Sequence, residues 1–576
     1  MTAEPKTSKS GLLNVPNVPA MGGLRERVDP AGLFAATSQV ARKAAANPVK
    51  VAKATSRFAT TAAMMPLATF DRMLNPQSVP PIPVNPKDRR FVDPAWEGNP
   101  GYFALRQLYL ALGIYVEELL AAGKGEGDGD MSDQKAAMTM RLAVDALSPT
   151  NFLVTNPGAL VKAFQSGGRS VVDGAAMALE DVVERGGRPK KVDADAFTVG
   201  QDLAATKGKV VFRNNLVEII QYSPETEQVH EVPMLVSPPW INKYYIMDLA
   251  PGRSLFEWAI QHNRTLFTLS YRNPDAAMRD YTFDNYLREG PLTGLDVVES
   301  ITGAKKIDIL ALCLGGAMAS MTAAYLSATG DDRINTITLT NTLLDYTKPG
   351  ELGTMVDPAT LKGLEKKMDQ AGFLDGAEMA GTFDMLRAND LIFNYVVSRW
   401  LQGEKPSAFD ILAWNEDSTR MPAAMHSMYL KSLYQQNALA KGEMELAGVQ
   451  LDLSKVTCDV YVVGTINDHI VPWDSSYQAV NLFGGDVRYV LSSGGHIAGV
   501  VNPPSPKSWY QADDTGEPMP TDPKAWREKT TKHSGSWWED WTSWYSSRAG
   551  KMVAPPPLGN SEYAPIMDAP GTYIFG

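Results

Sequence analysis

The stretch Ala311-Leu-Cys313-Leu-Gly-Gly316 decides the expected fold, because it joins two different kinds of secondary structure. It follows the apolar run 306–312 and precedes the alanine-rich, helix-like run 317–326. A strand, a tight turn and a helix are therefore expected around Cys313. This is the layout of a nucleophile elbow, in which small flanking residues permit a strained turn that presents one reactive side chain above a sheet. The usual frame is Gly-x-Ser-x-Gly, whereas here cysteine replaces serine and Ala311 replaces the first glycine.

Cys313 on its own allows two interpretations. A cysteine at the end of a strand is often a small buried hydrophobic residue. A cysteine thiolate is also a strong nucleophile that exchanges readily with thioesters. The rest of the chain has to decide between these two roles.

Composition limits the classes to which the protein can belong. Its 576 residues exceed what one simple core accommodates, so two or more domains are expected. The net charge of -11 argues against general nucleic-acid binding, which requires a basic face. A disulfide between the two cysteines, Cys313 and Cys458, would consume the candidate nucleophile, so a reducing, cytoplasmic setting is the simpler interpretation. We expect no signal peptide, no integral membrane segment, no metal and no cofactor.

The first part of the chain is expected to be helical. Residues 1–30 are rich in proline, serine, lysine and glycine, which predicts disorder. Residues 31–205 are expected to form a mostly helical N-terminal domain, including a helix over 102–120. The basic, alanine-rich region 31–74 is interpreted either as amphipathic helices that lie on an apolar surface or as ordinary solvated helices.

The second part, residues 206–576, is expected to be an α/β domain. Short β-rich runs alternate with helical ones there, which predicts an α/β-hydrolase fold with a largely parallel sheet. The strand pattern stops between about 343 and 454, and this insertion is interpreted as a helical or irregular cap. The candidate strands are 215–222, 232–236, 265–269, 307–312, 336–339, 460–463 and 487–491.

Two later residues complete a possible catalytic triad with the cysteine. An α/β-hydrolase places nucleophile, acid and histidine in that chain order, each at the carboxyl end of a strand. Asp468 and His496 each follow an apolar predicted strand, in that order after Cys313. His469 is an alternative base, but it shares the loop that holds the acid, so His496 is the predicted base. This constellation favours Cys313 as a nucleophile.

The oxyanion hole is expected to use two backbone N–H groups. One belongs to Leu314, which follows the nucleophile, and the other comes from the loop 237–248 after an earlier strand. Proline cannot donate, so Trp240 or Ile241 is the first available donor after the two prolines of that loop.

Several long motifs resemble those of the poly(3-hydroxyalkanoate) synthases. The resemblance extends from about residue 90 to the end, and length and the helical N-terminal region resemble the single-subunit class I enzymes, which prefer short-chain monomers. Ala311 is a departure, because the family normally has glycine there. The motifs are ALCLGG (311–316), PPWINKYYIMDL (238–249), SYRNPD (270–275), NDHIVPW (467–473), GGHIAGVVNPP (494–504) and HSGSWW (533–538).

The resemblance implies a polyester polymerase. Cys313 would attack an (R)-3-hydroxyacyl-CoA with His496 as base, and Asp468 would orient His496 or help to activate the incoming 3-hydroxyl. A homodimer, contacts with phasin-type granule proteins and a location at the surface of cytoplasmic polyester granules are also implied. The alternatives are a cysteine α/β-hydrolase or acyltransferase that releases a small product, and a non-catalytic granule-binding scaffold.

Overall fold

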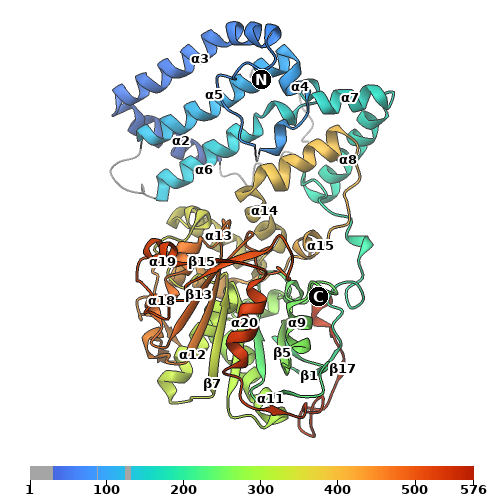
Figure 1. The fold of residues 1–576 in the computed structure, drawn as a ribbon, viewed down its shortest axis with the longest axis vertical. Coiled ribbons are helices and arrows are strands. Elements are labelled where there is room, and N and C mark those ends of the chain that lie inside the picture. The colour runs from blue at the N-terminus through green and yellow to red at the C-terminus, as the bar shows by residue number, and fades with distance from the viewer. Residues whose placement is uncertain (1–29, 87, 124–130) are drawn as a thin grey trace, which may run out of the picture. The chain divides into compact units, whose positions relative to one another are not determined.

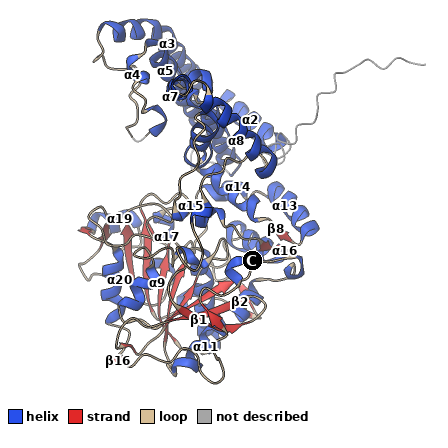
Figure 2. Ribbon diagram, turned by 90° about the vertical axis from the view of Figure 1, so that its right-hand side faces the viewer, coloured by secondary structure: helices blue, strands red, loops and turns tan. Residues whose placement is uncertain are grey.

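The computed structural model describes residues 30–86, 88–123 and 131–576. Of the segment expected to be disordered, 1–30, only Pro30 lies within the described residues. The described chain divides into two units, which are treated separately below. The first comprises 30–123, 139–191 and 388–406, and the second comprises 131–138, 192–387 and 407–576. Among the described residues, strands occur only in the second unit (Figures 1 and 2).

The first unit is helical. The helix expected over 102–120 is α5 (Pro100–Gly123), and both α2 (Pro30–Ala45) and α3 (Pro48–Leu74) pack against it. Its other helices are α4 (Ala95–Gly98), α7 (Pro157–Gln165), α8 (Arg169–Arg185), the π-helical turns η9 (Asn389–Phe393) and η10 (Val396–Leu401), and part of α6 (Met131–Ala146). No helix in the described part of the chain is long and apolar enough to cross a membrane.

Part of the range expected to form the cap packs within this helical unit. The Arg399 guanidinium lies 2.7 Å from the Asp181 carboxylate of α8, and both side chains are almost fully buried. A Cβ on Gly174 would lie 2.2 Å from the Trp400 carbonyl oxygen, so only glycine permits this approach of α8 and η10. Residues 388–406 are therefore anchored to α8.

The second unit is built on one mixed sheet. Its strand order is β15-β14-β13-β12-β7-β6-β4-β5-β2-β1-β17. The middle strands, from β13 to β5, are parallel, and the strands on both flanks are antiparallel. The sheet consists of β1 (Gly208–Arg213), β2 (Val217–Tyr222), β4 (Met234–Ser237), β5 (Leu266–Tyr271), β6 (Ile307–Leu312), β7 (Ile334–Thr340), β12 (Asp459–Thr465), β13 (Val487–Ser492), β14 (Trp509–Ala512), β15 (Thr531–Ser534) and β17 (Met567–Asp568).

The expectation of a largely parallel sheet is correct only for its middle. Residues 214–216 alone join the flanking strands β1 and β2, and a short connection of this kind joins antiparallel neighbours. The short strands β1, β14, β15 and β17 carry weak apolar patterns, and the sequence analysis did not identify them.

Helices cover both faces of the sheet, and alternate side chains of each strand supply the two cores. In β6, Ile309 and Ala311 face one core, while Leu310 and Leu312 face the other. The first core is closed by α10 (Phe283–Leu287), α11 (Thr293–Thr302) and α12 (Leu314–Thr329), and the second by α9 (Leu255–Gln261) and α20 (Trp537–Ser546) (Figure 1). Near-continuous apolar burial on both faces is typical of parallel strands.

The insertion after β7 is mainly helical, as expected. It contains α13 (Pro358–Ala371), α14 (Gly376–Leu386), α15 (Asp410–Glu416), α16 (Ala423–Met428) and the π-helix η11 (Tyr429–Gln435). Its strands have only two residues each: β8 (Phe373–Leu374), β9 (Met421–Pro422), β10 (Glu445–Leu446) and β11 (Val449–Gln450). Besides several short 3-10 helices, the unit also contains β3 (Val229–His230), β16 (Met552–Val553), α17 (Trp473–Ser476), α18 (Ala479–Leu482), α19 (Pro523–Lys529) and the π-helix η7 (Arg288–Leu292).

Candidate active site

Cys313 occupies a strained elbow between β6 and α12. Its backbone has φ 51° and ψ -119°, a conformation that is costly for a residue with a Cβ. Its N–H donates to the Thr340 carbonyl oxygen of β7 at 2.9 Å, which ties the turn to the sheet. The half-buried side chain stands at the N-terminus of α12, where the helix dipole favours negative charge.

The small residues around the cysteine are required by close backbone approaches. A Cβ on Gly315 would lie 2.0 Å from the Ser237 carbonyl oxygen, and a Cβ on Gly316 would lie 1.9 Å from Thr342 Oγ1. Ala311 is fully buried on β6 between Ser237 of β4 and Leu339 of β7. The methyl group of Ala311 therefore fits where the usual frame of a nucleophile elbow has glycine.

Asp468 and His496 meet at the carboxyl ends of β12 and β13. His496 Nδ1 lies 2.7 Å from Asp468 Oδ2, and the aspartate side chain is fully buried. Asp468 Oδ1 accepts from the N–H groups of Ile470 and Val471 at 2.8 and 2.9 Å. These bonds orient the carboxylate toward His496 and not toward its neighbour in the chain, His469.

The electrostatic environment holds a proton on His496. Burial alone lowers the pKa of this imidazole, but its charge interactions and hydrogen bonds with Asp468 and Cys313 outweigh burial and raise the pKa to about 10. The interaction with Cys313 also places the ring beside the sulfur. The arrangement therefore places a protonated imidazole next to the cysteine sulfur, a pair suited to nucleophilic attack.

Asn341 is a further residue of the site that the sequence analysis did not identify. It follows β7 with a positive φ of 45°, and its side-chain amide donates to the backbone carbonyl of His496. Its own N–H donates to the Val463 carbonyl oxygen at 2.8 Å. The sequence does carry a signal for Asn341, because it is a polar residue directly after the strand that follows the elbow.

Two backbone N–H groups expected to form an oxyanion hole are free of protein acceptors. Within the described chain, neither the Leu314 N–H nor the Trp240 N–H has a hydrogen-bond acceptor. The loop that carries Trp240 is held by Thr419, whose hydroxyl donates to the Trp240 carbonyl at 2.8 Å. The contact of Gly315 with Ser237 brings this loop against the start of α12.

A buried part of the cap, including α16 and η11, packs into the same apolar core as the elbow. One member, His426 of α16, is 2% exposed, and burial lowers its pKa to about 3. This histidine is therefore neutral in the folded protein at pH 7.

We expect His426 to make the protein sensitive to acid. Its folded pKa lies below the unfolded value near 6.5, so its contribution to stability is complete above pH 6.5 and is lost as the pH falls. Below pH 6.5 the free energy of unfolding falls by about 1.4 kcal/mol per pH unit, which amounts to about 2 kcal/mol at pH 5. Urea unfolding at pH 5 and pH 7.5 measures the difference in the free energy of unfolding between the two pH values. The His426→Leu variant should show a difference that is smaller by about 2 kcal/mol. An unchanged pH dependence in the variant would contradict the expectation.

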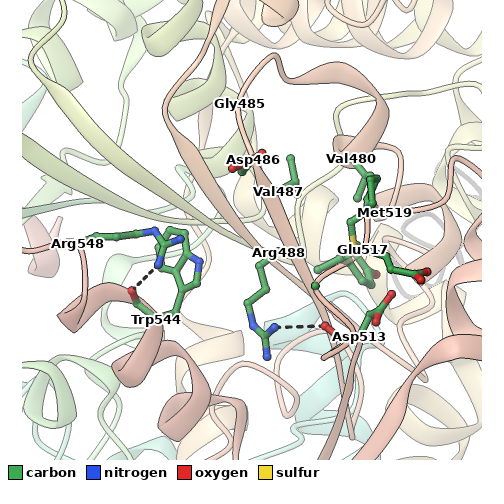
Figure 3. Close-up of a pocket in the computed structure, with 13 residues that line it drawn as sticks. Val480, Gly485, Asp486, Val487, Arg488, Asp513, Glu517, Met519, Trp544 and Arg548 are labelled. Carbon is green, nitrogen blue, oxygen red and sulfur yellow. Dashed lines mark hydrogen bonds between the residues drawn. The ribbon is translucent and has the colours of Figure 1, made fainter.

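A cavity of about 600 Å³ lies away from this site. Its lining includes Asp486, Val487 and Arg488 around the start of β13, the end of the strand opposite to His496. Figure 3 shows Arg488 and Arg548 donating to the backbone carbonyls of Asp513 and Trp544, at 3.5 and 3.1 Å. Both arginines also pair with aspartates, so the cavity does not serve the chemistry of Cys313.

The cysteines are unpaired, and the described residues contain no group of three or more histidine, cysteine, aspartate or glutamate residues placed to hold a metal ion. Burial raises the pKa of Cys458 to about 12, so its thiol stays protonated. Cys313 is therefore the cysteine with the surroundings of a nucleophile.

Comparison with known proteins shows the family to which the chain belongs. Residues 87–259 match the family model described as poly-beta-hydroxybutyrate polymerase (PhaC) N-terminus, and residues 292–503 match the model of the alpha/beta hydrolase fold. The poly(3-hydroxyalkanoate) polymerase of Methylorubrum extorquens is 41% identical, over 92% of this chain and 87% of that protein. Poly(3-hydroxyalkanoate) polymerase 1 of Ectopseudomonas oleovorans is 39% identical, over 94% of each chain.

Among solved structures, a Paleococcus ferrophilus monoacylglycerol lipase aligns at 12% identity with a TM-score of 0.32, covering 58% of this chain and 99% of that one. The relatedness to the polymerases extends over nearly the whole chain, including both described units. The chain belongs to the poly(3-hydroxyalkanoate) polymerases, a family of acyltransferases with an α/β-hydrolase fold.

Proposed function

We propose that this protein polymerises (R)-3-hydroxyacyl-CoA, mainly short-chain monomers such as 3-hydroxybutyryl-CoA, into polyester with release of CoA. The observation that carries the proposal is the Asp468–His496 pair, joined at 2.7 Å, beside a cysteine at a strained elbow. Relatives with the name of such polymerases, at about 40% identity over most of the chain, support the substrate class.

In the acylation step, the proton of the Cys313 thiol resides on His496 and the sulfur attacks the thioester carbonyl. The N–H groups of Leu314 and Trp240 bind the oxyanion of the tetrahedral intermediate, because neither has an acceptor among the residues that the structure describes. The carbon–sulfur bond to CoA then breaks, and His496 returns the proton to the departing CoA sulfur. The acyl group remains as a thioester of Cys313, still activated for transfer.

In the transfer step, the 3-hydroxyl of another acyl unit attacks the Cys313 thioester and forms an ester. His496 is the base that takes the hydroxyl proton and passes it to the released Cys313 sulfur. Asp468 is better placed to orient His496 than to act on substrate. Its side chain is fully buried, one oxygen accepts two backbone N–H groups, and the other lies against the imidazole.

Water competes with the hydroxyl for the acyl-enzyme, so the site has to be shielded. The buried part of the cap around α16 and η11 supplies this shield. We further propose that the protein acts as a homodimer at the surface of cytoplasmic polyester granules, where phasin-type proteins are possible partners. The homodimer, the granule location and the phasin-type partners are proposed from the family resemblance.

A CoA-release assay with acyl-CoA substrates of increasing chain length tests the proposal. We expect release to be fastest with short (R)-3-hydroxyacyl-CoA and to yield an insoluble polyester. Release of CoA with only the free hydroxy acid as product would instead identify a thioester hydrolase. Absence of CoA release from every substrate would point to a non-catalytic scaffold.

A further inference from the structure

Three tyrosine side chains form a polar cluster inside the otherwise apolar cap. Tyr346 lies in the loop after β7, and Tyr429 and Tyr434 lie on the π-helix η11. The Tyr346 and Tyr434 rings are 4.7 Å apart, and the Tyr429 and Tyr434 rings are 5.4 Å apart, both edge to face. The Tyr429 and Tyr434 hydroxyls lie 3.5 Å apart, and Tyr346 also interacts with the Tyr429 hydroxyl. The three hydroxyls therefore converge.

The π-helical winding brings two of these tyrosines together. Residues five apart in an α-helix point about 140° away from each other. A π-helix closes hydrogen bonds between residues five apart, so Tyr429 and Tyr434 lie on the same side of η11. Single turns of this kind are frequent at functional sites. Asn437 fixes the third tyrosine, because its side-chain oxygen accepts the Tyr346 N–H at 2.9 Å.

The cluster and the nucleophile share one core, because Cys313 packs against the apolar cluster that contains all three tyrosines. Burial raises the pKa of all three tyrosines, to about 12 for Tyr434, and an electrostatic interaction with Cys313 raises each further. The hydroxyls are thus neutral hydrogen-bond donors near the sulfur. The surrounding cap residues Met425, Leu430 and Leu433 are buried and apolar.

The cluster has hydrogen-bonding capacity to spare. Three hydroxyls carry three O–H donors, and a chain of bonds among them uses only two. A buried donor without an acceptor is costly, so a ligand oxygen that accepts from the cluster is favoured. An acyl group on Cys313 has a polar oxygen close to the sulfur, on the third carbon.

The geometry points to the hydroxyls of Tyr346, Tyr429 and Tyr434 as the site that binds the 3-oxygen of the acyl group held at Cys313. This inference rests on the proposed function and extends it by naming the residues that select a 3-hydroxyacyl group over an unsubstituted one. The same contact directs the acyl chain into the cap and the carbonyl carbon toward Cys313.

Tyrosine-to-phenylalanine variants with two substrates test the inference. We compare single-turnover acylation by (R)-3-hydroxybutyryl-CoA and by butyryl-CoA, which lacks the 3-oxygen. Tyr429→Phe and Tyr434→Phe should each slow acylation by the hydroxylated substrate about 10-fold and change acylation by butyryl-CoA less than about 2-fold. Tyr346→Phe should act in the same direction. If wild-type protein is not acylated by butyryl-CoA, the inhibition constant of butyryl-CoA replaces its rate.

Tyr545→Phe is the matched control. The Tyr545 hydroxyl is also buried and neutral, and it donates to the His262 carbonyl at 3.2 Å, on the opposite core of the sheet. This variant should leave the acylation rate unchanged with both substrates. An equal loss with both substrates in the cluster variants, or no loss with either, would overturn the inference. Failure of wild-type protein to release CoA from 3-hydroxybutyryl-CoA would instead overturn the proposed function.

Discussion

Cys313→Ala is expected to abolish CoA release from 3-hydroxybutyryl-CoA. The substitution removes the sulfur that attacks the thioester. By comparison with nucleophile deletions in other acyl-transfer enzymes, the loss should be at least about 10⁴-fold. A colorimetric thiol assay measures release, and radiolabelled substrate should no longer label the protein. Because alanine is small and the turn is set by backbone contacts, the fold should be retained.

Cys458→Ala is the matched control for this experiment. Burial raises the pKa of Cys458 to about 12, which leaves it a protonated and unreactive thiol. Release should stay within about 2-fold of wild type. Retained release in Cys313→Ala, or lost release in a well-folded Cys458→Ala protein, would contradict the assignment of the nucleophile.

Asp468→Asn should lower the rate of CoA release by about 10²- to 10⁴-fold. Burial opposes the charged form of His496, and the Asp468 carboxylate is a main reason that its pKa is nevertheless raised to about 10. Without that charge the pKa of His496 falls, and the proton stays on the Cys313 sulfur at neutral pH. An amide can also hold the imidazole in the wrong tautomer, as its NH₂ group can face the ring.

The pH profile of Cys313 alkylation by iodoacetamide separates this electrostatic role from a structural one. In wild-type protein the imidazolium persists to about pH 10, so alkylation should vary little between pH 6 and pH 9. In Asp468→Asn, alkylation should become slow at pH 7 and rise with pH. Asp452→Asn, in an exposed turn, should leave the wild-type profile unchanged. A flat profile in Asp468→Asn would rule out the proposed pairing.

The core of the site was predictable because its signals are local. The apolar run before Cys313 and the small residues after it specify strand, elbow and helix. Asp468 and His496 each follow an apolar strand, and parallel strands bring their carboxyl ends to one edge of the sheet. Chain order and strand ends were therefore sufficient to predict that these two side chains would meet.

Other features depend on contacts between segments far apart in the chain. The antiparallel flanks of the sheet and the anchoring of residues 388–406 to α8 follow from pairings that no local pattern specifies. Tyr429 and Tyr434 are five residues apart, so an α-helix would place them on different sides. The π-helix, packed against the core, places them on the same side.

The sequence by itself determined the α/β-hydrolase fold, the elbow at Cys313 and the order of the three triad residues, because periodicity and small-residue spacing act over short stretches of chain. Only the tertiary structure decided why Gly315 and Gly316 have no side chain, how Asn341 holds His496, and that the Tyr429 and Tyr434 hydroxyls of the cap lie close together. These features depend on close packing between distant segments, and such contacts exist only once the chain has folded.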